Sequence, residues 1–308
     1  MGVKGLYTYL KQYRREIYPH LRQSGGETDE GPLRIGIDAM SMLYKFKAQY
    51  KEMYPLLLAL KVQGHKLLFV FDGKPPAEKV EEVTARREAR QDAAAQAAAI
   101  KEHLADASSA TTDKERRILE FSAARLEHQG WHVTRDVRHD FQRALWDMEI
   151  PYVKAAGEAD DVLTDMAGAE KLDVIISTDM DFLLSAVPRL WIPFRKLADG
   201  FEEVTLWDVL DGEGVSPAGL LDAGILCGVE SLRGQVSFPV QKAFGWMRFY
   251  GSVEALLASS AVREAGLHPL REEGRLEAAR AHFRPQQLWS GRIRPDHFER
   301  AREFLEAL

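Results

Sequence analysis

The chain has 308 residues, a formal net charge of −6 and a single cysteine, Cys227. Its length suits one large domain or two modest ones, and 45% hydrophobic with 29% charged residues is typical of a soluble globular protein. The acidic balance argues against a protein that coats nucleic acid indiscriminately, and one cysteine excludes an internal disulfide and disfavours a cysteine-built zinc site. No apolar run is long enough to cross a bilayer, so no membrane association is expected.

Short apolar runs that end in aspartate recur along the first part of the chain. "LRIGID" ends at Asp38, "KLLFVFD" ends at Asp72, and "LDVIISTD" ends at Asp179. Continuous apolar runs separated by helical patterns are typical of buried parallel strands, so the class is α/β. A helical stretch over 39–64 separates the first two strands.

Residues from about 79 to 139 are helical, charged and rich in alanine. The segment "ADASSATTDKE" over 105–115 is a break between two helices, with Ser, Thr or Asp available as an N-cap. This block is too polar for a core, and we expect a helix pair that projects from the sheet. A further helix is expected to open at "GEADD", and from about residue 211 the pattern is helical with no further clear strand.

The aspartates at the strand ends form the main candidate site. Functional groups of α/β sheets gather beyond the carboxyl ends of the strands, so these aspartates should meet. The converging carboxylates would be those of Asp38, Asp72, Glu158, Asp160, Asp179 and Asp181. Repulsion among them must be relieved by raised pKa values or by cations, and oxygen ligands without His or Cys select Mg²⁺ or Mn²⁺. Two such ions are the usual device for cutting phosphodiesters.

Simpler interpretations exist for each of these residues. A strand-terminal aspartate is often a turn former or an N-cap, and acidic residues at a helix start favour the helix dipole. Glu158 and Asp160 are two apart, so both face the site only if Glu158 precedes the helix; otherwise Glu158 pairs with Asp161. We favour Asp160 and keep Asp161 as the alternative.

Five motifs, in order from Met1 to about Leu184, resemble those of the flap-endonuclease and XPG family of structure-specific 5′ nucleases. They are "MGVKGL", "IGIDAMSMLYKF", "FVFDGKPPAEKVEEVTARREAR", "IPYVKAAGEADDVLTDMA" and "STDMDFLL". The resemblance implies a PIN-like (resolvase-like) α/β core with a mostly parallel sheet flanked by helices. It also implies a helical arch and a C-terminal helix–two-turn–helix-type region that grips duplex DNA. The expected domains are a core over 1–210, with the arch at about 79–139, and a helical DNA-binding region over 211–308.

The same resemblance assigns roles to particular positions. Lys79 and Arg86 match two basic residues at the arch base that act on the scissile phosphate, and their spacing puts them on one helical face. The simpler interpretation is a solvated helix face. The expected metal ligands are Asp38, Asp72, Glu158, Asp160, Asp179, Asp181 and Glu230. The expected nucleic-acid contacts are Gly2, Lys74, Arg90, Arg233 and Lys242.

The chain departs from the family pattern in two places. Asp160 stands where the family has a glutamate, which shortens that ligand by one methylene. The segment "GILCGVESLRGQVSFPVQKAFG" is shorter than the family's and lacks its glycine turn. Glu230 is therefore only a candidate for the seventh carboxylate, and potassium binding is placed in doubt.

The sequence thus predicts a divalent-metal-dependent 5′ flap endonuclease or 5′-3′ exonuclease of DNA repair or replication, leaving 5′-phosphate and 3′-hydroxyl ends. Its substrate would be DNA with a 5′ flap, a nick or a free 5′ end. An RNA-directed nuclease of the same fold and a catalytically inactive nuclease-like scaffold are the alternatives. We expect a monomer in the nucleus, the cytoplasm or a viral replication site, without a PCNA-binding motif.

Overall fold

The computed structural model describes residues 3, 5–18, 31–76, 79–106, 112–194, 200–232, 234–259, 265–283 and 292–294. Within these residues the centre of the molecule is a seven-stranded sheet in the order β1-β7-β6-β5-β2-β3-β4. The strands are β1 (Arg15–Ile17), β2 (Arg34–Asp38), β3 (Lys66–Phe71), β4 (Tyr152–Lys154), β5 (Val174–Ile176), β6 (Arg189–Pro193) and β7 (Phe201–Thr205). β2 to β6 pair in parallel, whereas β7 is antiparallel to β6 and β1. The mostly parallel α/β sheet expected from the sequence is confirmed.

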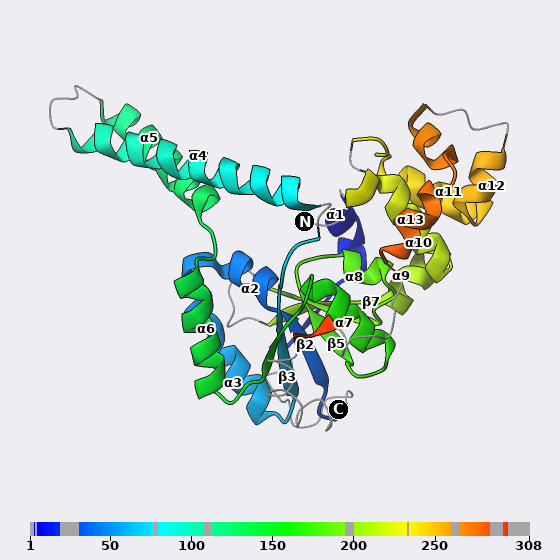
Figure 1. Ribbon diagram of the computed structural model, residues 1–308, viewed down its shortest axis with the longest axis horizontal. Coiled ribbons are helices and arrows are strands. Elements are labelled where there is room, and N and C mark those ends of the chain that lie inside the picture. Colours follow the sequence, from blue (N-terminus) through cyan, green and yellow to red (C-terminus); the bar gives the residue numbers. More distant parts are fainter. Residues whose placement is uncertain are drawn as a thin grey trace.

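Helices cover both faces of this sheet (Figure 1). Those before β5 are α1 (Leu6–Tyr9), α2 (Ala39–Phe46), α3 (Tyr54–Val62), α4 (Val80–Ala105), α5 (Asp113–Gly130), α6 (Arg135–Asp147) and α7 (Ala159–Gly168). Those after it are α8 (Asp181–Leu184), α9 (Leu206–Glu213), α10 (Pro217–Gly228), α11 (Val240–Tyr250), α12 (Val253–Ala258) and α13 (Arg275–Ala281). Short 3₁₀ helices lie at η1 (Leu10–Tyr13), η2 (Lys47–Met53), η5 (Glu230–Leu232) and η6 (Ala265–Arg271).

Two hydrophobic cores follow from side chains that alternate across the strands. Ile35, Ile37 and Phe69 point to the face covered by α2, α3 and α6. Leu68 and Val70 point to the opposite face, where α7, α8 and the C-terminal helices pack. Burial on both faces explains why β2 and β3 read as continuous apolar runs rather than alternating ones.

The sequence predicted only the strands that end in aspartate. β1 and β4 are three residues long, and no strand was predicted for the residues of β6 and β7. The helix expected over 39–64 is interrupted by η2, which begins at Lys47 with a positive φ of 50°. No helix of the described residues combines the length and the apolar character that a membrane span needs.

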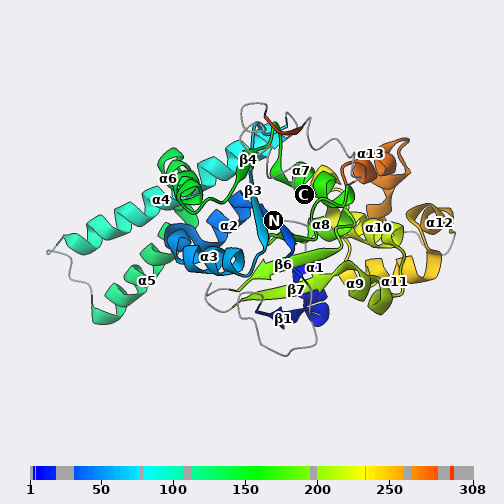
Figure 2. The same cartoon turned by 90° about the horizontal axis from the view of Figure 1, so that it is seen from below.

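The helix pair α4–α5 projects away from the sheet as an arm (Figures 1 and 2). The predicted break is confirmed, since α4 ends at Ala105 and Thr112 caps α5 by accepting from the Glu115 amide. The helices approach closely at Gly130, where a Cβ would lie 2.9 Å from the Ala94 nitrogen. The pair ends at Gly130, and α6 packs on the sheet through the buried Phe141 and Leu145. Residues 135–139 of the expected arch therefore belong to a helix of the core.

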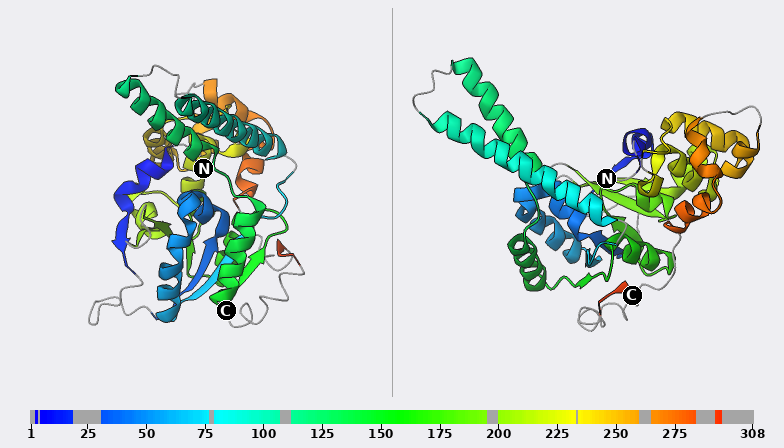
Figure 3. Two further views of the ribbon diagram at one scale, coloured as in Figure 1. Left: turned by 90° about the vertical axis from the view of Figure 1, so that its left-hand side faces the viewer. Right: turned by 45° about the horizontal axis from the view of Figure 1, so that its top comes forward.

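The N-terminus ties the sheet to the C-terminal helices, which lie opposite the arm (Figure 3). Tyr9 stacks on Phe244 of α11, with ring centroids 5.2 Å apart. The buried Glu213 of α9 accepts hydrogen bonds from Tyr13 at 2.7 Å and from Arg248 at 2.8 Å. The region after residue 211 thus packs on the core through the first helical turns of the chain.

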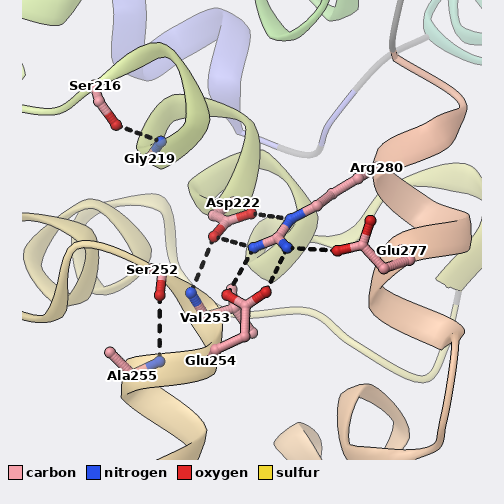
Figure 4. Close-up of polar contacts among 9 residues, drawn as sticks. All are labelled: Ser216, Gly219, Asp222, Ser252, Val253, Glu254, Ala255, Glu277 and Arg280. Atoms are coloured by element: carbon pink, nitrogen blue, oxygen red, sulfur yellow. Dashed lines mark hydrogen bonds and ion pairs between the residues drawn. The ribbon is translucent and has the colours of Figure 1, made fainter.

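A buried ion pair organises the C-terminal helices (Figure 4). Arg280 donates to both carboxylate oxygens of Asp222, at 2.8 and 2.7 Å, and the Val253 amide also donates to Asp222 at 2.9 Å. Asp222 is 1% exposed, and the exposed Glu254 and Glu277 complete the acceptors around Arg280. Helices α10, α12 and α13 therefore share one guanidinium.

We expect Arg280→Ala to lower the free energy of unfolding by about 3 kcal/mol, because the buried Asp222 carboxylate loses its counter-ion. Denaturant unfolding at neutral pH measures this change. Glu277→Gln is the control, since Glu277 is exposed and its pair with Arg280 is worth about 0.5 kcal/mol. Equal effects of the two substitutions would contradict the structural role of the Asp222–Arg280 pair.

Candidate active site

A cleft of about 1210 Å³ lies beyond the carboxyl ends of β2, β3 and β5. β2 is the point from which the sheet extends both ways, towards β3 and towards β5, and such switch points are where α/β folds bind ligands. The acidic residues of the candidate metal site all line the cleft: Asp38, Asp72, Glu158, Asp160, Asp179, Asp181 and Glu230. The basic residues Lys79, Arg86 and Arg90 line it too.

Asp38 is the most buried of these carboxylates, at 7% exposed. It ends β2 and caps α2, accepting from the Ser41 amide at 2.9 Å and from the Ser177 hydroxyl at 3.1 Å. Burial, followed by the charge of Asp72, raises the pKa of Asp38 to about 7. The Asp38 side chain therefore both caps α2 and lines the cleft.

The two aspartates that follow β5 are linked to each other. Asp179 accepts from the Asp181 amide at 3.0 Å, and Asp181 in turn accepts from the Val3 amide at 2.9 Å. Burial and then the charge of Asp179 raise the pKa of Asp181 to about 7. The chain's N-terminal segment therefore reaches the cleft and supplies a donor to it.

Asp72 reaches the cleft because the chain after β3 runs close to the turn before α7. The Gly73 amide donates to Gly157 at 2.7 Å, and a Cβ on Gly73 would lie 2.0 Å from the Ala155 carbonyl oxygen. This approach, open only to glycine, lets Asp72 accept from the Ala159 amide at the start of α7, at 2.9 Å. Burial raises the pKa of Asp72 above its ordinary value.

Asp160 and Asp161 have different partners in the structure. Glu158 stands at the N-cap of α7 in extended conformation, as required for Glu158 and Asp160 to face one site. Desolvation by the surrounding protein, followed by the charges of Asp38 and Asp179, raises the pKa of Asp160 well above its ordinary value. Part of the residue is nevertheless exposed at the surface of the cleft. Asp161 instead pairs with Arg292 at 3.0 Å, and Arg292 also contacts Asp165.

Lys79 and Arg86 face acidic partners across the cleft. Lys79 lies 2.7 Å from Glu158 and 2.9 Å from Glu230, and Arg86 lies 3.4 Å from Glu230. Burial acts to lower the pKa of Lys79, but the hydrogen bonds to Glu158 and Glu230 outweigh it and raise the pKa overall. Glu230, on the shortened segment after α10, is thus held by the base of the arm.

The rim of the cleft carries aromatic groups that the sequence analysis did not single out. The Arg90 guanidinium lies 4.7 Å from the ring centroid of Tyr44 and donates to its hydroxyl at 3.0 Å. Trp131 meets Tyr44 edge-on, with centroids 5.9 Å apart. Ser41, Ser177 and Arg292 were also not predicted, although Ser41 and Ser177 stand beside the predicted aspartates in sequence.

The remaining predicted nucleic-acid contacts are scattered. Gly2 and Arg233 lie outside the described residues. Lys74 is exposed after β3, outside the lining of the cleft. Lys242 lies on α11 over the rings of Phe238 and Trp246, 5.6 and 4.8 Å from their centroids.

Comparison with known proteins agrees with this geometry. Residues 149–230 match the XPG I-region. The chain is 29% identical to flap endonuclease 1 of Eremothecium gossypii over 76% of this chain and 63% of that protein, and 28% identical to flap endonuclease 1 of Methanothrix thermoacetophila over 67% and 62%. The chain is therefore similar in sequence to the flap endonucleases, and part of it matches the XPG I-region. Its alignments with these two curated relatives thus span less than two thirds of their lengths.

Two solved structures share the fold of this chain. The catalytic core of Rad2 in complex with DNA substrate superposes with a TM-score of 0.59 at 15% identity, over 99% of this chain and 95% of that one. Flap endonuclease-1 from Methanococcus jannaschii gives a TM-score of 0.55 at 20% identity, over 92% and 84%. The XPG I-region match contains Glu158, Asp160, Asp179, Asp181 and Glu230.

The donor chemistry of the cleft fits a hard divalent cation. Its acidic groups offer only oxygen, and burial followed by the charges of neighbouring carboxylates raises the pKa values of Asp38, Asp160 and Asp181. As the side chains stand, no group of three or more His, Cys, Asp or Glu residues among those described is arranged to hold an ion. Several carboxylates are instead engaged by amides and by Lys79. The assignment of these carboxylates as metal ligands is a proposal.

The raised pKa of Asp38 predicts a pH dependence for the metal-free protein. The folded state keeps a proton that the unfolded state releases above about pH 4, so stability falls as pH rises from there to about 7. Asp38→Asn should flatten this fall, by about 1.4 kcal/mol for each pKa unit removed.

Denaturant unfolding in a chelator between pH 4.5 and 7.5 measures the effect. Asp173→Asn is the control. The hydrogen bond from Arg34 lowers the pKa of Asp173, so the contribution of Asp173 to stability changes with pH only below pH 4.5. A wild-type slope that Asp38→Asn leaves unchanged would refute the prediction.

Proposed function

We propose that this chain is a divalent-metal-dependent, structure-specific 5′ nuclease that hydrolyses DNA phosphodiesters to 5′-phosphate and 3′-hydroxyl ends. The observation that carries the proposal is the meeting of the strand-end carboxylates with Lys79 and Arg86 in one cleft. Oxygen ligands for cations and fixed cations for a phosphate are the two parts that phosphodiester hydrolysis needs. The relatives named flap endonuclease 1 and the XPG I-region support the reaction class.

The carboxylates of the cleft would hold Mg²⁺ or Mn²⁺. Asp38, Asp160 and Asp179 are the central candidates, because their charges act on one another, and Asp72 and Asp181 flank them. When bound, a pair of such ions acidifies the attacking water and neutralises charge on the phosphate and the leaving oxygen. Glu158 and Glu230 would complete the site after they exchange Lys79 for a cation.

Lys79 and Arg86 would act on the phosphate directly. Both reach into the cleft from the start of α4, and both are engaged by carboxylates in the DNA-free protein. A scissile phosphate entering beside Glu230 offers these cations a new acceptor. We propose that they leave Glu230 and Glu158 to donate to the phosphate, and that their charge stabilises the transition state.

The expected substrate is DNA with a 5′ flap, a nick or a free 5′ end. The solved Rad2 core is described in complex with a DNA substrate, and a core of the same fold with an arm and a C-terminal helical region is present here. We propose that residues 1–210 form the nuclease unit and that the region from 211 contacts the duplex, with Lys242 as a candidate. Action as a monomer and a nuclear or cytoplasmic location remain predictions.

We expect purified protein to cut a 5′-flap DNA with Mg²⁺ or Mn²⁺ and to lose this activity in EDTA. Asp181→Ala should lower the rate at least about 100-fold, because a proposed ligand is removed. Cleavage assays on flap, nicked, single-stranded and RNA substrates measure this, and circular dichroism checks that the variant folds. If the wild type cleaves none of these substrates, the proposal is wrong. If it prefers the RNA substrate, RNA rather than DNA is the substrate.

The contrast between neighbouring aspartates gives a second expectation. Asp160→Asn should reduce cleavage about 100-fold or more, since Asp160 faces the other carboxylates. Asp161→Asn should keep activity within about tenfold of the wild type, because Asp161 pairs with Arg292 instead. Single-turnover rates of the two variants decide between the residues, and the reverse order would assign the ligand to Asp161.

A further inference from the structure

A segment far along the sequence, residues 292–294, lies at the edge of the sheet beside the cleft. Ile293 forms an antiparallel bridge with Ala155, just beyond β4, and its side chain is buried in the core. Main-chain hydrogen bonds flank this bridge. The Ala156 amide donates to the Arg292 carbonyl oxygen at 2.6 Å, and a second bond of 2.9 Å lies on the other side of the bridge. The segment therefore holds the backbone that leads from β4 to α7.

The turn that this segment contacts carries two of the proposed metal ligands to the cleft. Glu158 is the N-cap of α7, and Asp160 lies in the first turn of the helix. The chain after β3 contacts the same turn, since the Gly73 amide donates to Gly157 at 2.7 Å. The start of α7 is thus held by two segments that are far apart in the sequence.

The Arg292 side chain pairs with two carboxylates on one face of α7. Its Nη1 lies 3.0 Å from Asp161, and its Nε lies 3.0 Å from Asp165. These aspartates are four residues apart, so they are neighbours on the helix and repel each other unless a cation lies between them. Arg292 supplies that cation from the segment drawn in red beside α7 in Figure 1.

Pairing on this face determines which way α7 is turned. Successive residues of a helix point about 100° apart, so Asp160 faces elsewhere when Asp161 and Asp165 face Arg292. Asp160 then lies among the carboxylates at the strand ends, where the charge of Asp38 acts on it. A rotation of α7 would take Asp160 out of this cluster and would also break the pairs with Arg292.

We propose that Arg292 is a positioning residue of the metal site, which holds α7 in the rotation that presents Asp160 to the cations. It acts through its pairs with Asp161 and Asp165, together with the main-chain hydrogen bonds of its own segment. The inference rests on the proposed function and deepens it. The nuclease unit over 1–210 needs a segment from the C-terminal region to complete its site.

The competing role for Arg292 is a direct contact with a substrate phosphate, because Arg292 also lines the cleft. Burial decides between the two roles. The side chains of Glu158 and Glu230 are 23% and 31% exposed, so water can solvate them when Lys79 leaves. The Asp165 side chain is only 2% exposed, and the departure of Arg292 would leave a buried charge without its partner. Arg292 therefore stays on α7.

Calorimetric titration of Mn²⁺ measures the effect on the proposed site. Arg292→Gln should weaken binding about 10- to 100-fold, which is the usual cost of removing a group that orients a metal ligand. Arg292→Lys keeps one positive charge and should give an intermediate affinity. Arg294→Gln is the control for charge, since Arg294 is an exposed cation of the same segment outside the lining of the cleft.

Arg280→Ala is the control for stability, because it breaks a buried ion pair that lies outside the cleft. Circular dichroism checks that each variant is folded at the temperature of the titration. Arg294→Gln and Arg280→Ala should both bind Mn²⁺ as tightly as the wild type does.

Hydrogen exchange in EDTA tests the positioning of α7 without a metal. The amides of residues 162–166 should exchange at least about tenfold faster in Arg292→Gln than in the wild type, because the helix loses the pairs that hold it. In an Asp165→Asn background the effect of Arg292→Gln should shrink, since its buried partner is already neutral. DNA affinity in EDTA should be unchanged in Arg292→Gln.

Equal Mn²⁺ affinity of Arg292→Gln and the wild type, or an equal loss in Arg280→Ala, would overturn the positioning role. A loss of DNA affinity in Arg292→Gln, with a salt slope smaller by about 0.9, would overturn it too and would assign Arg292 to a phosphate. If the wild type itself binds no Mn²⁺, the proposed function is wrong and the role of Arg292 fails with it. Binding that is unaffected by Arg292→Gln counts against the role of Arg292 alone.

Discussion

Repulsion between carboxylates is the constraint on which this site depends. Asp38, Asp72, Asp160 and Asp181 all have raised pKa values, because protein surrounds them and because like charges act on several of them. Such a cluster persists only if the rest of the fold holds it in place. The free energy that holds it comes from the two cores that bury the strands on both faces of the sheet.

The fold offsets part of this repulsion with donors drawn from distant parts of the chain. The Val3, Ser41 and Ala159 amides each donate to a different aspartate, and Lys79 lies between Glu158 and Glu230. The arm therefore contributes a counter-charge to the site as well as a surface above it. In the proposed reaction Glu158 and Glu230 bind metal ions in place of Lys79, and Lys79 then donates to the phosphate. Binding of the ions and binding of the substrate would therefore both break the contacts of Lys79 with Glu158 and Glu230.

Much of this arrangement could be predicted from the sequence because it is local. An apolar run closed by aspartate places Asp38, Asp72 and Asp179 at the same edge of a parallel sheet, and the spacing of Glu158 and Asp160 required Glu158 to precede α7, as it does. The contacts that complete the site could not be predicted, because they join distant segments. Nothing in the local pattern shows that Arg292 pairs with Asp161, that Val3 reaches Asp181, or that Glu230 meets Lys79. The short strands β1 and β4 were missed because their residues, REI and YVK, form no continuous apolar run, whereas the equally short β5 is apolar and fully buried.

The central claim is that the carboxylate cluster is a cation site, and calorimetric titration of Mn²⁺ into the metal-free protein tests it most directly. At pH 7 we predict saturable binding with net proton release, detected as a dependence of the heat on the ionisation enthalpy of the buffer, because ions displace protons from aspartates with raised pKa values. Asp38→Asn should weaken the binding and reduce the proton release. Absence of binding, or binding that Asp38→Asn leaves unchanged, would contradict the account.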